Sequence, residues 1–148
     1  MIDYDFRKNF PYPVIRPEQE TAIKFILDAF LKDGKKYVIC EAGTGVGKSA
    51  IGLTVAKTLN EVMVLDPLGK HEQGSYFLTT QKILQDQYIK DFGKPLGKMC
   101  SIKSSTNYSC SFHKSQNCGE SQALLKTEKQ GSKFWNACTI NCVYKKEK

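Results

Sequence analysis

The sequence lacks any run of 18 apolar residues, so we expect no segment that spans a membrane and no membrane partner. Residues 1–10 are charged and contain no apolar stretch, which argues against a secretory signal. From these absences we expect an intracellular protein, cytoplasmic or nucleoid-associated and not secreted. The 148 residues are 41% hydrophobic, which is enough for one globular domain, alone or with a small module.

Close C-x2-C pairs, which structural zinc sites usually contain, are also absent. The chain nevertheless has six cysteines, and without a secretory signal we expect reduced thiols that bind metal rather than disulfides. A C-x2-H pair, Cys110 and His113, leaves zinc open as one possible metal. Cys40 lies in an apolar stretch and is expected in the core. The last four cysteines have the spacing C-x7-C-x19-C-x3-C, at Cys110, Cys118, Cys138 and Cys142.

Acidic residues are scarce in the last part of the chain. Residues 93–148 contain ten lysines, three glutamates and five of the six cysteines, whereas residues 1–92 contain twelve basic and twelve acidic residues. The whole net charge of +7 therefore belongs to residues 93–148. Clustered cations displace counterions from phosphates, which favours a nucleic-acid surface there, with a solvated lysine face as the alternative. The composition thus predicts two parts, residues 1–92 and residues 93–148.

Hydrophobic periodicity predicts that helices and strands alternate in the first part. The expected helices are 17–33, 48–59 and 81–92, and the expected strands are 36–40, 61–65 and 75–80. This alternation is typical of the α/β class with a mainly parallel sheet. Beyond residue 93 the periodicity is weak, apart from a helix expected around residues 120–136.

A phosphate-binding loop is the most specific motif of the first part. Residues 42–49, AGTGVGKS, stand between an expected strand and an expected helix, where glycines can aim backbone N–H groups at phosphate oxygens. The start of the following helix presents its positive dipole end to the same anion. Lys48 can reach the β- and γ-phosphates of ATP, and the Ser49 hydroxyl can bind Mg²⁺. These two are the residues expected to act in catalysis.

A phosphate-binding loop also occurs in nucleotide kinases, so a second reading stays open. Residues 62–66, VMVLD, end in Asp66, which in a small kinase-like protein would hold Mg²⁺. No second acidic residue follows it, because Pro67 comes next. A buried strand whose last residue starts a turn explains Asp66 equally well.

Several segments resemble the XPD/DinG group of superfamily 2 DNA helicases, which carry an iron–sulfur cluster. The form A-x-x-G-x-G-K-S of the loop resembles helicase motif I, and FPYPVIRPEQ, residues 10–19, resembles the segment that precedes it in this group. TTQKILQDQY, residues 79–88, resembles motif Ia. KSSTNYSC, residues 103–110, and NCVYKK, residues 141–146, resemble the segments that carry the first and last cluster ligands.

This resemblance implies a RecA-like domain that binds ATP and single-stranded DNA. Gln19 would read the adenine edge, with Arg16 nearby. Thr79, Thr80 and Gln81 would contact the phosphates of single-stranded DNA. The implied ATP-binding set is Arg16, Gln19, Gly43, Thr44, Gly45, Val46, Gly47, Lys48 and Ser49.

For the cysteines, the resemblance implies a 4Fe–4S cluster inserted before the Walker B motif, with zinc as the alternative. The four implied ligands are Cys110, Cys118, Cys138 and Cys142. The expected fold is thus part of a RecA-like domain, residues 1–92, followed by a Cys-rich metal-cluster module, residues 93–148.

The implied activity is ATP-driven translocation on single-stranded DNA with 5′-to-3′ polarity. The sequence contains neither a DEAH-type Walker B motif nor the later helicase motifs. We therefore expect the remainder of a helicase chain as a partner and little activity from these residues alone. The alternative is a non-catalytic nucleic-acid adaptor with a zinc site.

Overall fold

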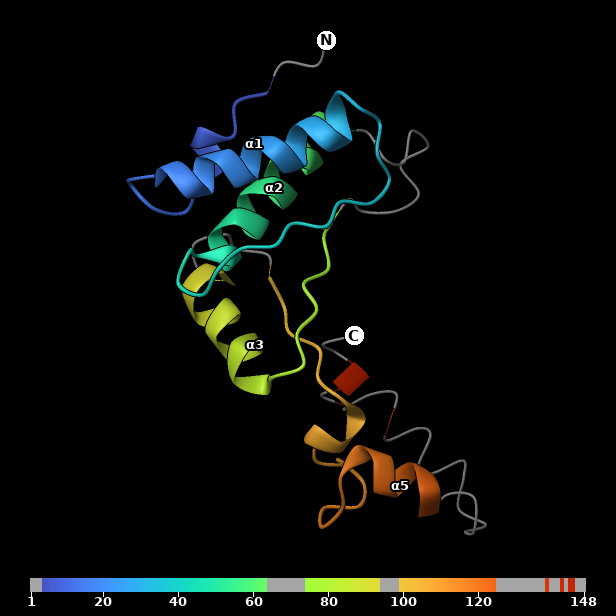
Figure 1. The fold of residues 1–148 in the computed structure, drawn as a ribbon. Helices are drawn as coiled ribbons and strands as arrows, with labels where there is room; N and C mark the ends of the chain where they lie inside the picture. Colours follow the sequence, from blue (N-terminus) through green and yellow to red (C-terminus); the bar gives the residue numbers. More distant parts are fainter. Residues whose placement is uncertain are drawn as a thin grey trace. The chain divides into compact units, whose positions relative to one another are not determined.

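The computed structural model describes residues 4–63, 74–93 and 99–124 and the single positions 138, 142, 144 and 145. The chain divides into two compact units, Met1–Leu78 and Thr79–Lys148 (Figure 1). The division between the units precedes Thr79, whereas the charge distribution changes near residue 92. Among the described residues, no helix is both long and apolar enough to cross a membrane.

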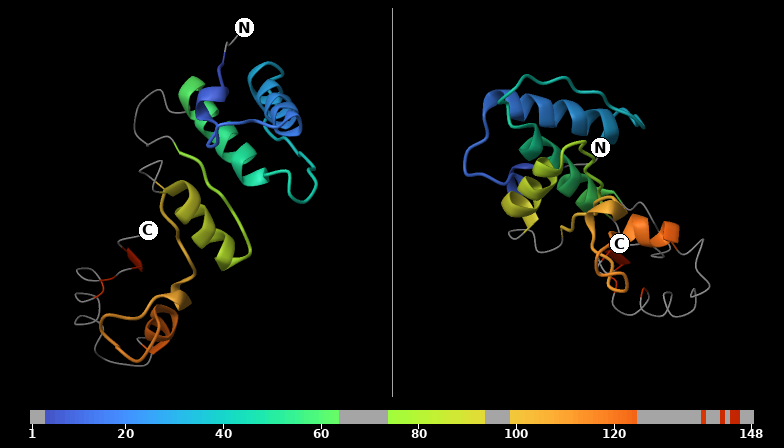
Figure 2. Two further views of the ribbon diagram at one scale, coloured as in Figure 1. Left: turned by 90° about the vertical axis from the view of Figure 1, so that its left-hand side faces the viewer. Right: turned by 90° about the horizontal axis from the view of Figure 1, so that it is seen from below.

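The first unit is built on two 15-residue helices, which pack against each other (Figure 2). Helix α1 spans Pro17–Leu31 and follows the short 3₁₀ helix η1, Arg7–Asn9. Proline suits the first position of a helix, because its missing N–H would have no partner there. Helix α1 ends at Leu31, two residues before the predicted end at residue 33, and Gly34 beyond it adopts a positive φ of 64°.

Helix α2 spans Lys48–Val62 and begins immediately after the glycine-rich loop, as predicted. Its end corrects the prediction of a strand over residues 61–65, because residues 61 and 62 belong to the helix. Glu61 is held there by Lys8, whose Nζ lies 3.0 Å from the carboxylate. The Met63 N–H then closes the helix on the Leu59 carbonyl. Residues 64 and 65 of the predicted strand, and Asp66, lie outside the described residues.

The other two predicted strands are not paired in the described part of the chain. Residues 36–40 and 75–80 have no regular structure, and the single β-bridge of the described residues lies elsewhere, in the second unit. Tyr37 and Ile39 are about nine-tenths exposed, as are Tyr76 and Leu78. A strand is stable only when a neighbour takes its backbone hydrogen bonds. The parallel sheet and the RecA-like domain therefore stay predictions, while the prediction of a buried Cys40 is wrong because this thiol is exposed.

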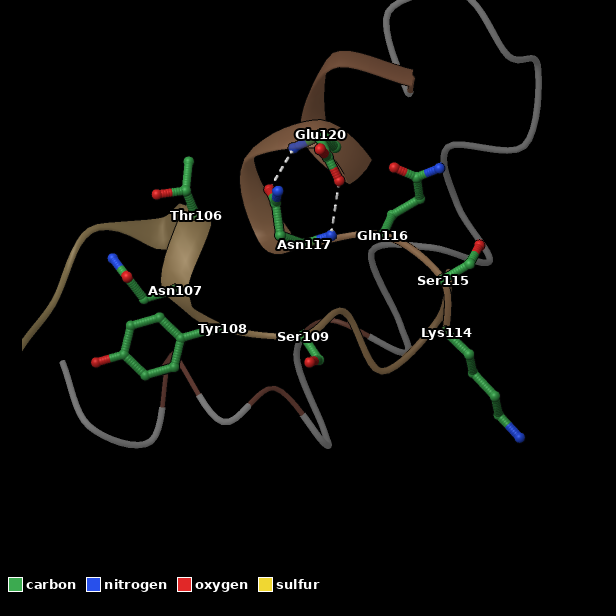
Figure 3. A pocket seen from close by; sticks show the side chains of 9 residues that line it. All are labelled: Thr106, Asn107, Tyr108, Ser109, Lys114, Ser115, Gln116, Asn117 and Glu120. Carbon is green, nitrogen blue, oxygen red and sulfur yellow. Dashed lines mark hydrogen bonds between the residues drawn. The ribbon is translucent and has the colours of Figure 1, made fainter.

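The second unit contains short elements joined by turns. Helix α3 spans Lys82–Tyr88 and continues into a π-helical turn, η2, Ile89–Gly93, in which the Phe92 ring is buried beside Tyr88. A 3₁₀ helix, η3, Ser105–Asn107, comes next. Helix α5, Cys118–Leu124, is the described start of the helix expected around residues 120–136, and residues 125–136 lie outside the description. Between η3 and α5 the chain turns back on itself as a small hairpin (Figure 3).

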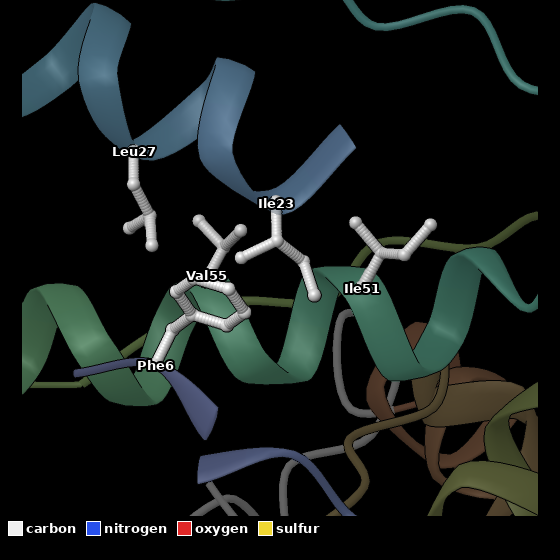
Figure 4. Close-up of a cluster of buried hydrophobic side chains, with 5 residues drawn as sticks. All are labelled: Phe6, Ile23, Leu27, Ile51 and Val55. Atoms are coloured by element: carbon white, nitrogen blue, oxygen red, sulfur yellow. The ribbon is translucent and has the colours of Figure 1, made fainter. Parts of the chain in front are cut away.

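The core of the first unit lies between α1, α2 and the N-terminal segment. Side chains four residues apart lie on the same face of a helix, so Ile23 and Leu27 of α1 meet Ile51 and Val55 of α2 (Figure 4). Phe6 covers the same cluster from the N-terminal segment. Burying one side chain of this size contributes about 1.5–3 kcal/mol. This core fixes α2, and with it the end of the glycine-rich loop.

Polar contacts attach the N-terminal segment to the two helices. Tyr4 donates a hydrogen bond to the Asp28 carboxylate, and burial together with this bond raises the pKa of Tyr4 to about 12. Asn9 is buried, and its amide donates to the Thr58 hydroxyl at 3.2 Å and to the Glu61 carboxylate at 3.0 Å. The segment is therefore tied to α2 through a buried amide as well as through Phe6.

Replacing Asn9 by alanine is expected to destabilise the first unit by about 1–3 kcal/mol, since the buried partners lose their donor. The measurement is the urea midpoint of unfolding, followed by circular dichroism. Arg7→Ala is the control, because it removes an exposed ion pair to Glu20 and should move the midpoint little. Equal midpoints for the two variants would contradict a structural role for the Asn9 amide.

Candidate functional site

The glycine-rich loop of the first unit has the backbone of an anion-binding turn. Gly45 and Gly47 have φ angles of 83° and 86°, a region that disfavours any side chain. Gly47 is the N-cap of α2 and its carbonyl accepts the Ala50 N–H at 3.0 Å. The first N–H groups of a helix have no partner within it, so the start of α2 is suited to hold a phosphate.

Lys48 closes this loop onto itself. Its Nζ donates to the carbonyls of Ala42 at 3.1 Å and Gly43 at 2.9 Å, and the side chain is exposed. The ammonium group therefore lies over the loop, where it can exchange these carbonyls for phosphate oxygens. Ser49, the predicted Mg²⁺ ligand, is half-buried at the next position of α2.

Gln19 and Arg16 lie at the start of α1. Gln19 is only 6% exposed, and its Oε1 accepts the Arg16 N–H at 3.0 Å, a side-chain cap of the helix start. Its Nε2 donates to the Val46 carbonyl of the loop at 2.8 Å. The structure thus brings Gln19 to the loop predicted to bind ATP, by a contact that the sequence did not reveal. The Arg16 side chain is exposed.

The predicted DNA-contacting residues belong to the second unit. Thr79 accepts the Gln81 N–H at 3.3 Å, and Gln81 is the residue that precedes α3. Thr80 and Gln81 are exposed, and Thr79 is half-buried. The two threonines and Gln81 therefore share one compact unit with the four cysteines predicted as cluster ligands.

A hairpin positions the first two cysteines of the predicted cluster. Ser109 and Asn117 form an antiparallel bridge, and beside it the N–H of Cys110 donates to Gln116 at 2.9 Å and that of Cys118 to Tyr108 at 2.8 Å. Both cysteines are therefore held by backbone hydrogen bonds of the same bridge.

A capping box fixes the start of α5 at Cys118. The Asn117 side chain accepts the Glu120 N–H at 2.9 Å, and the Glu120 carboxylate accepts the Asn117 N–H at 3.0 Å (Figure 3). The pattern N-x-x-E was visible in the sequence, and its partners show why α5 begins where it does.

Polar groups around Cys110 favour its thiolate. Burial raises the pKa of Cys110, but the polar groups near its sulfur, the Ser121 hydroxyl and the backbone N–H groups of His113 and Phe112, outweigh it and lower the pKa below its usual value. The His113 N–H lies 3.4 Å from the sulfur. A thiolate is the form of cysteine that binds metal.

The other three thiols of the predicted set interact with one another. Burial raises the pKa of Cys118, and the neighbouring thiols Cys142 and Cys110 raise it further. Burial also raises the pKa of Cys138, again with contributions from Cys142 and Cys118. Each of the four cysteines predicted as ligands therefore interacts electrostatically with at least one other of the set.

The interactions among these four cysteines do not amount to the geometry of a metal site. Within the part of the chain that the structure describes, no three Cys, His, Asp or Glu side chains have the arrangement of a metal site. Cys40 and Cys100 are exposed and take no part in the interactions above. The role of the four cysteines as ligands stays a prediction that their proximity favours.

A polar hollow of about 320 Å³ lies beside the hairpin, and sequence reasoning missed it (Figure 3). Hydroxyl and amide groups dominate its lining, and the Lys114 side chain extends away from the turn of the hairpin. Its wall includes the capping pair Asn117 and Glu120, so part of its polarity serves the fold. The lining residues are Thr106, Asn107, Tyr108, Ser109, Lys114, Ser115, Gln116, Asn117 and Glu120.

A glycine-rich turn that ends in Lys-Ser at the start of a helix defines a P-loop nucleotide-binding protein. Residues 13–147 match the family described as type III restriction enzyme, res subunit, and the chain belongs to this family. The match confirms the predicted superfamily 2 helicase class and supports ATP and Mg²⁺ use and nucleic-acid binding at the level of that class. No curated protein and no solved structure matches the chain.

Proposed function

We propose that this chain provides the nucleotide-binding and cluster-carrying part of an ATP-dependent DNA helicase of the XPD/DinG type. The parent enzyme would couple ATP hydrolysis to 5′-to-3′ movement along single-stranded DNA. One observation carries this proposal beyond the family match: of the five cysteines in the second unit, four interact electrostatically with one another and stand in the order and segments of that helicase group. The other two thiols are exposed, so the gathering is selective.

The loop residues support ATP binding by their chemistry. Backbone N–H groups of residues 43–47 and the start of α2 provide donors for phosphates, and Lys48 provides an exposed cation. Ser49 supplies a hydroxyl for Mg²⁺, which neutralises phosphate charge when bound. Lys48 must leave the carbonyls of Ala42 and Gly43 to contact a phosphate, and its exposure leaves it free to do so.

The donor set of the second unit fits an iron–sulfur cluster. Four thiols match the usual ligand number of a 4Fe–4S cluster, which supplies a rigid link between distant chain segments when bound. Backbone N–H groups directed at the Cys110 sulfur stabilise the thiolate that such a cluster requires. The bridge at Ser109 and the cap at Asn117 keep Cys110 and Cys118 in fixed positions.

The first unit is proposed to be the start of a RecA-like domain. Residues 36–40 would form the strand before the phosphate loop. Residues 75–80, whose last two residues belong to the second unit, would form a neighbouring strand. Two facts support this: in each segment the central side chain, Val38 or Phe77, is partly buried, while its apolar neighbours on both sides are exposed. Such alternation is typical of a strand with its two faces in different surroundings.

Single-stranded DNA is the proposed polynucleotide. Thr79, Thr80 and Gln81 offer hydroxyl and amide groups for phosphates in the unit that also holds the whole net positive charge. The polar hollow beside the hairpin, with Lys114 at its rim, adds donors for phosphate or sugar oxygens. Contacts of this kind give affinity through released counterions rather than through base reading.

Charge reversal in the basic region is expected to weaken DNA binding. The variant Lys114→Glu/Lys126→Glu should reduce affinity for a labelled single strand at least about tenfold at low salt. It should also reduce the slope of log affinity against log salt by about 1.4, since each lost phosphate contact accounts for about 0.7. Fluorescence anisotropy with single-stranded and duplex oligonucleotides at several salt concentrations measures both, and the single strand should bind more tightly.

The matched control is Lys35→Glu/Lys36→Glu, which makes the same charge change at two exposed lysines of the first unit. Equal losses in the two double variants would show a general charge effect and remove the basic region as the DNA surface. Tighter binding of duplex than of single strands would contradict the proposed substrate.

A further inference from the structure

Gln19 is a buried polar side chain that belongs to α1 but acts on the phosphate loop. Gln19 is 6% exposed, and its side-chain amide accepts the Arg16 N–H at 3.0 Å through Oε1 and donates to the Val46 carbonyl at 2.8 Å through Nε2. One N–H and one oxygen lone pair of the amide remain for other partners. Reading an adenine edge therefore accounts for only part of what this residue does.

The bond to Val46 sets the orientation of a peptide group within the loop. The Val46 carbonyl and the Gly47 N–H belong to the same trans peptide, in which the two groups point in opposite directions. When Gln19 holds the carbonyl, the Gly47 N–H is directed away from Gln19. This N–H belongs to the series of backbone donors by which such loops bind phosphates.

The two flanking glycines make this peptide the part of the loop most in need of a restraint. Gly45 and Gly47 adopt positive φ angles, but glycine adopts negative φ about as readily. The intrinsic preference of these two residues therefore does not fix the conformation of the loop. A side chain at Gly47 is excluded for a second reason: its Cβ would lie 2.6 Å from the Gln19 Nε2. The close approach of Gln19 therefore requires glycine at this position and restrains it at the same time.

We propose that Gln19 is a positioning residue for the phosphate loop and supports binding of polyphosphate whatever base is attached. The α1–α2 core anchors Gln19, because Ile23, one turn further along the same helix, is completely buried. The loop is thus shaped from outside, by a helix that precedes it in the chain. This inference rests on the proposed nucleotide binding of the loop.

The test uses Gln19→Glu, which has nearly the same shape. Its carboxylate can still accept the Arg16 N–H but cannot donate to the Val46 carbonyl, so it removes the loop contact and keeps the helix cap. We expect about tenfold weaker binding of Mg–ATP, Mg–GTP and Mg–tripolyphosphate alike, the effect of one lost hydrogen bond. Isothermal titration calorimetry measures the three affinities. A loss confined to ATP would show that Gln19 only reads adenine and would overturn the proposal.

Amide hydrogen exchange of residues 43–47 in nucleotide-free protein provides a second readout. Exchange should be several-fold faster in Gln19→Glu and in the apolar isostere Gln19→Met, and unchanged in Thr21→Ala, whose hydroxyl contacts only the Pro17 carbonyl on an exposed part of α1. Unchanged exchange in both Gln19 variants overturns the positioning role. If the wild-type protein binds no polyphosphate, the proposed nucleotide function fails, while the exchange rates still decide the role of Gln19.

Discussion

The substitution Cys118→Ser is expected to remove nearly all bound iron and to loosen the second unit around the hairpin. Cys118 is 5% exposed, begins α5 and interacts with the thiols of both Cys110 and Cys142. A serine hydroxyl is a much poorer ligand than a thiolate, and metal binding in a small polar segment also supplies much of its folding free energy. The wild-type protein, purified without oxygen, should contain iron and sulfide in about equal amounts.

Metal content and hydrogen exchange of residues 105–124 measure this effect. Serine replacements of Cys110, Cys138 and Cys142 should behave like Cys118→Ser. The exposed thiols provide matched controls, so Cys40→Ser and Cys100→Ser should keep their iron. Loss of iron in Cys100→Ser, with retention in Cys118→Ser, would make the ligand assignment wrong. A colourless wild-type protein that contains zinc would favour the zinc-bound adaptor instead.

Lys48→Ala is expected to weaken Mg–ATP binding by about 10- to 100-fold, the range for a lost charged hydrogen bond. Folding should change little, because the two loop carbonyls that Lys48 contacts lie with it in an exposed turn. Titration calorimetry measures the affinity, and thermal unfolding without nucleotide checks the fold. Lys35→Ala, at an exposed lysine of the same unit, should bind ATP as the wild type does.

A measurement of ATP turnover distinguishes the helicase from the kinase-like protein, the two enzyme classes that the sequence left open. We expect negligible ATP turnover from these residues alone, because the sequence contains no DEAH-type Walker B motif. Rapid turnover that disappears in Asp66→Asn would favour the kinase-like reading. Unchanged ATP affinity in Lys48→Ala would show that the loop is not the nucleotide site.

The four candidate cysteine ligands show what could be predicted from spacing in the sequence. The order of Cys110, Cys118, Cys138 and Cys142 and the segments around them led to the prediction that these four of the six thiols are ligands, and this stays a prediction. Sequence alone does not show whether residues 20 or more positions apart converge, since this depends on how the intervening chain folds back. Only the structure displays the bridge at Ser109, which positions Cys110 and Cys118, and the electrostatic interactions of Cys142 with Cys118 and Cys138.

Local signals determined α1, α2 and the phosphate loop. Pro17 at the first position of α1, apolar residues at helical spacing and glycines before Lys48 each act within a few residues, so their effects are visible in the sequence. The same reasoning ended α2 too early, because the contacts that hold Glu61 in the helix come from Lys8 and Asn9, more than 50 positions away. It also misplaced Cys40, since burial of an apolar stretch requires a partner surface that local pattern does not provide.

The sequence by itself predicted a phosphate-binding, glycine-rich loop at a helix start and a protein of the helicase class, because both predictions depend on short motifs of fixed spacing. Tertiary structure decided what holds that loop in shape. Gln19 reaches Val46 across 27 positions, and the contact exists only because the α1–α2 core brings the start of one helix to the start of the other. The spacing of residues along the chain predicts contacts within one turn, such as those of the glycine-rich loop. Which distant side chains share a hydrogen bond depends on how the helices pack.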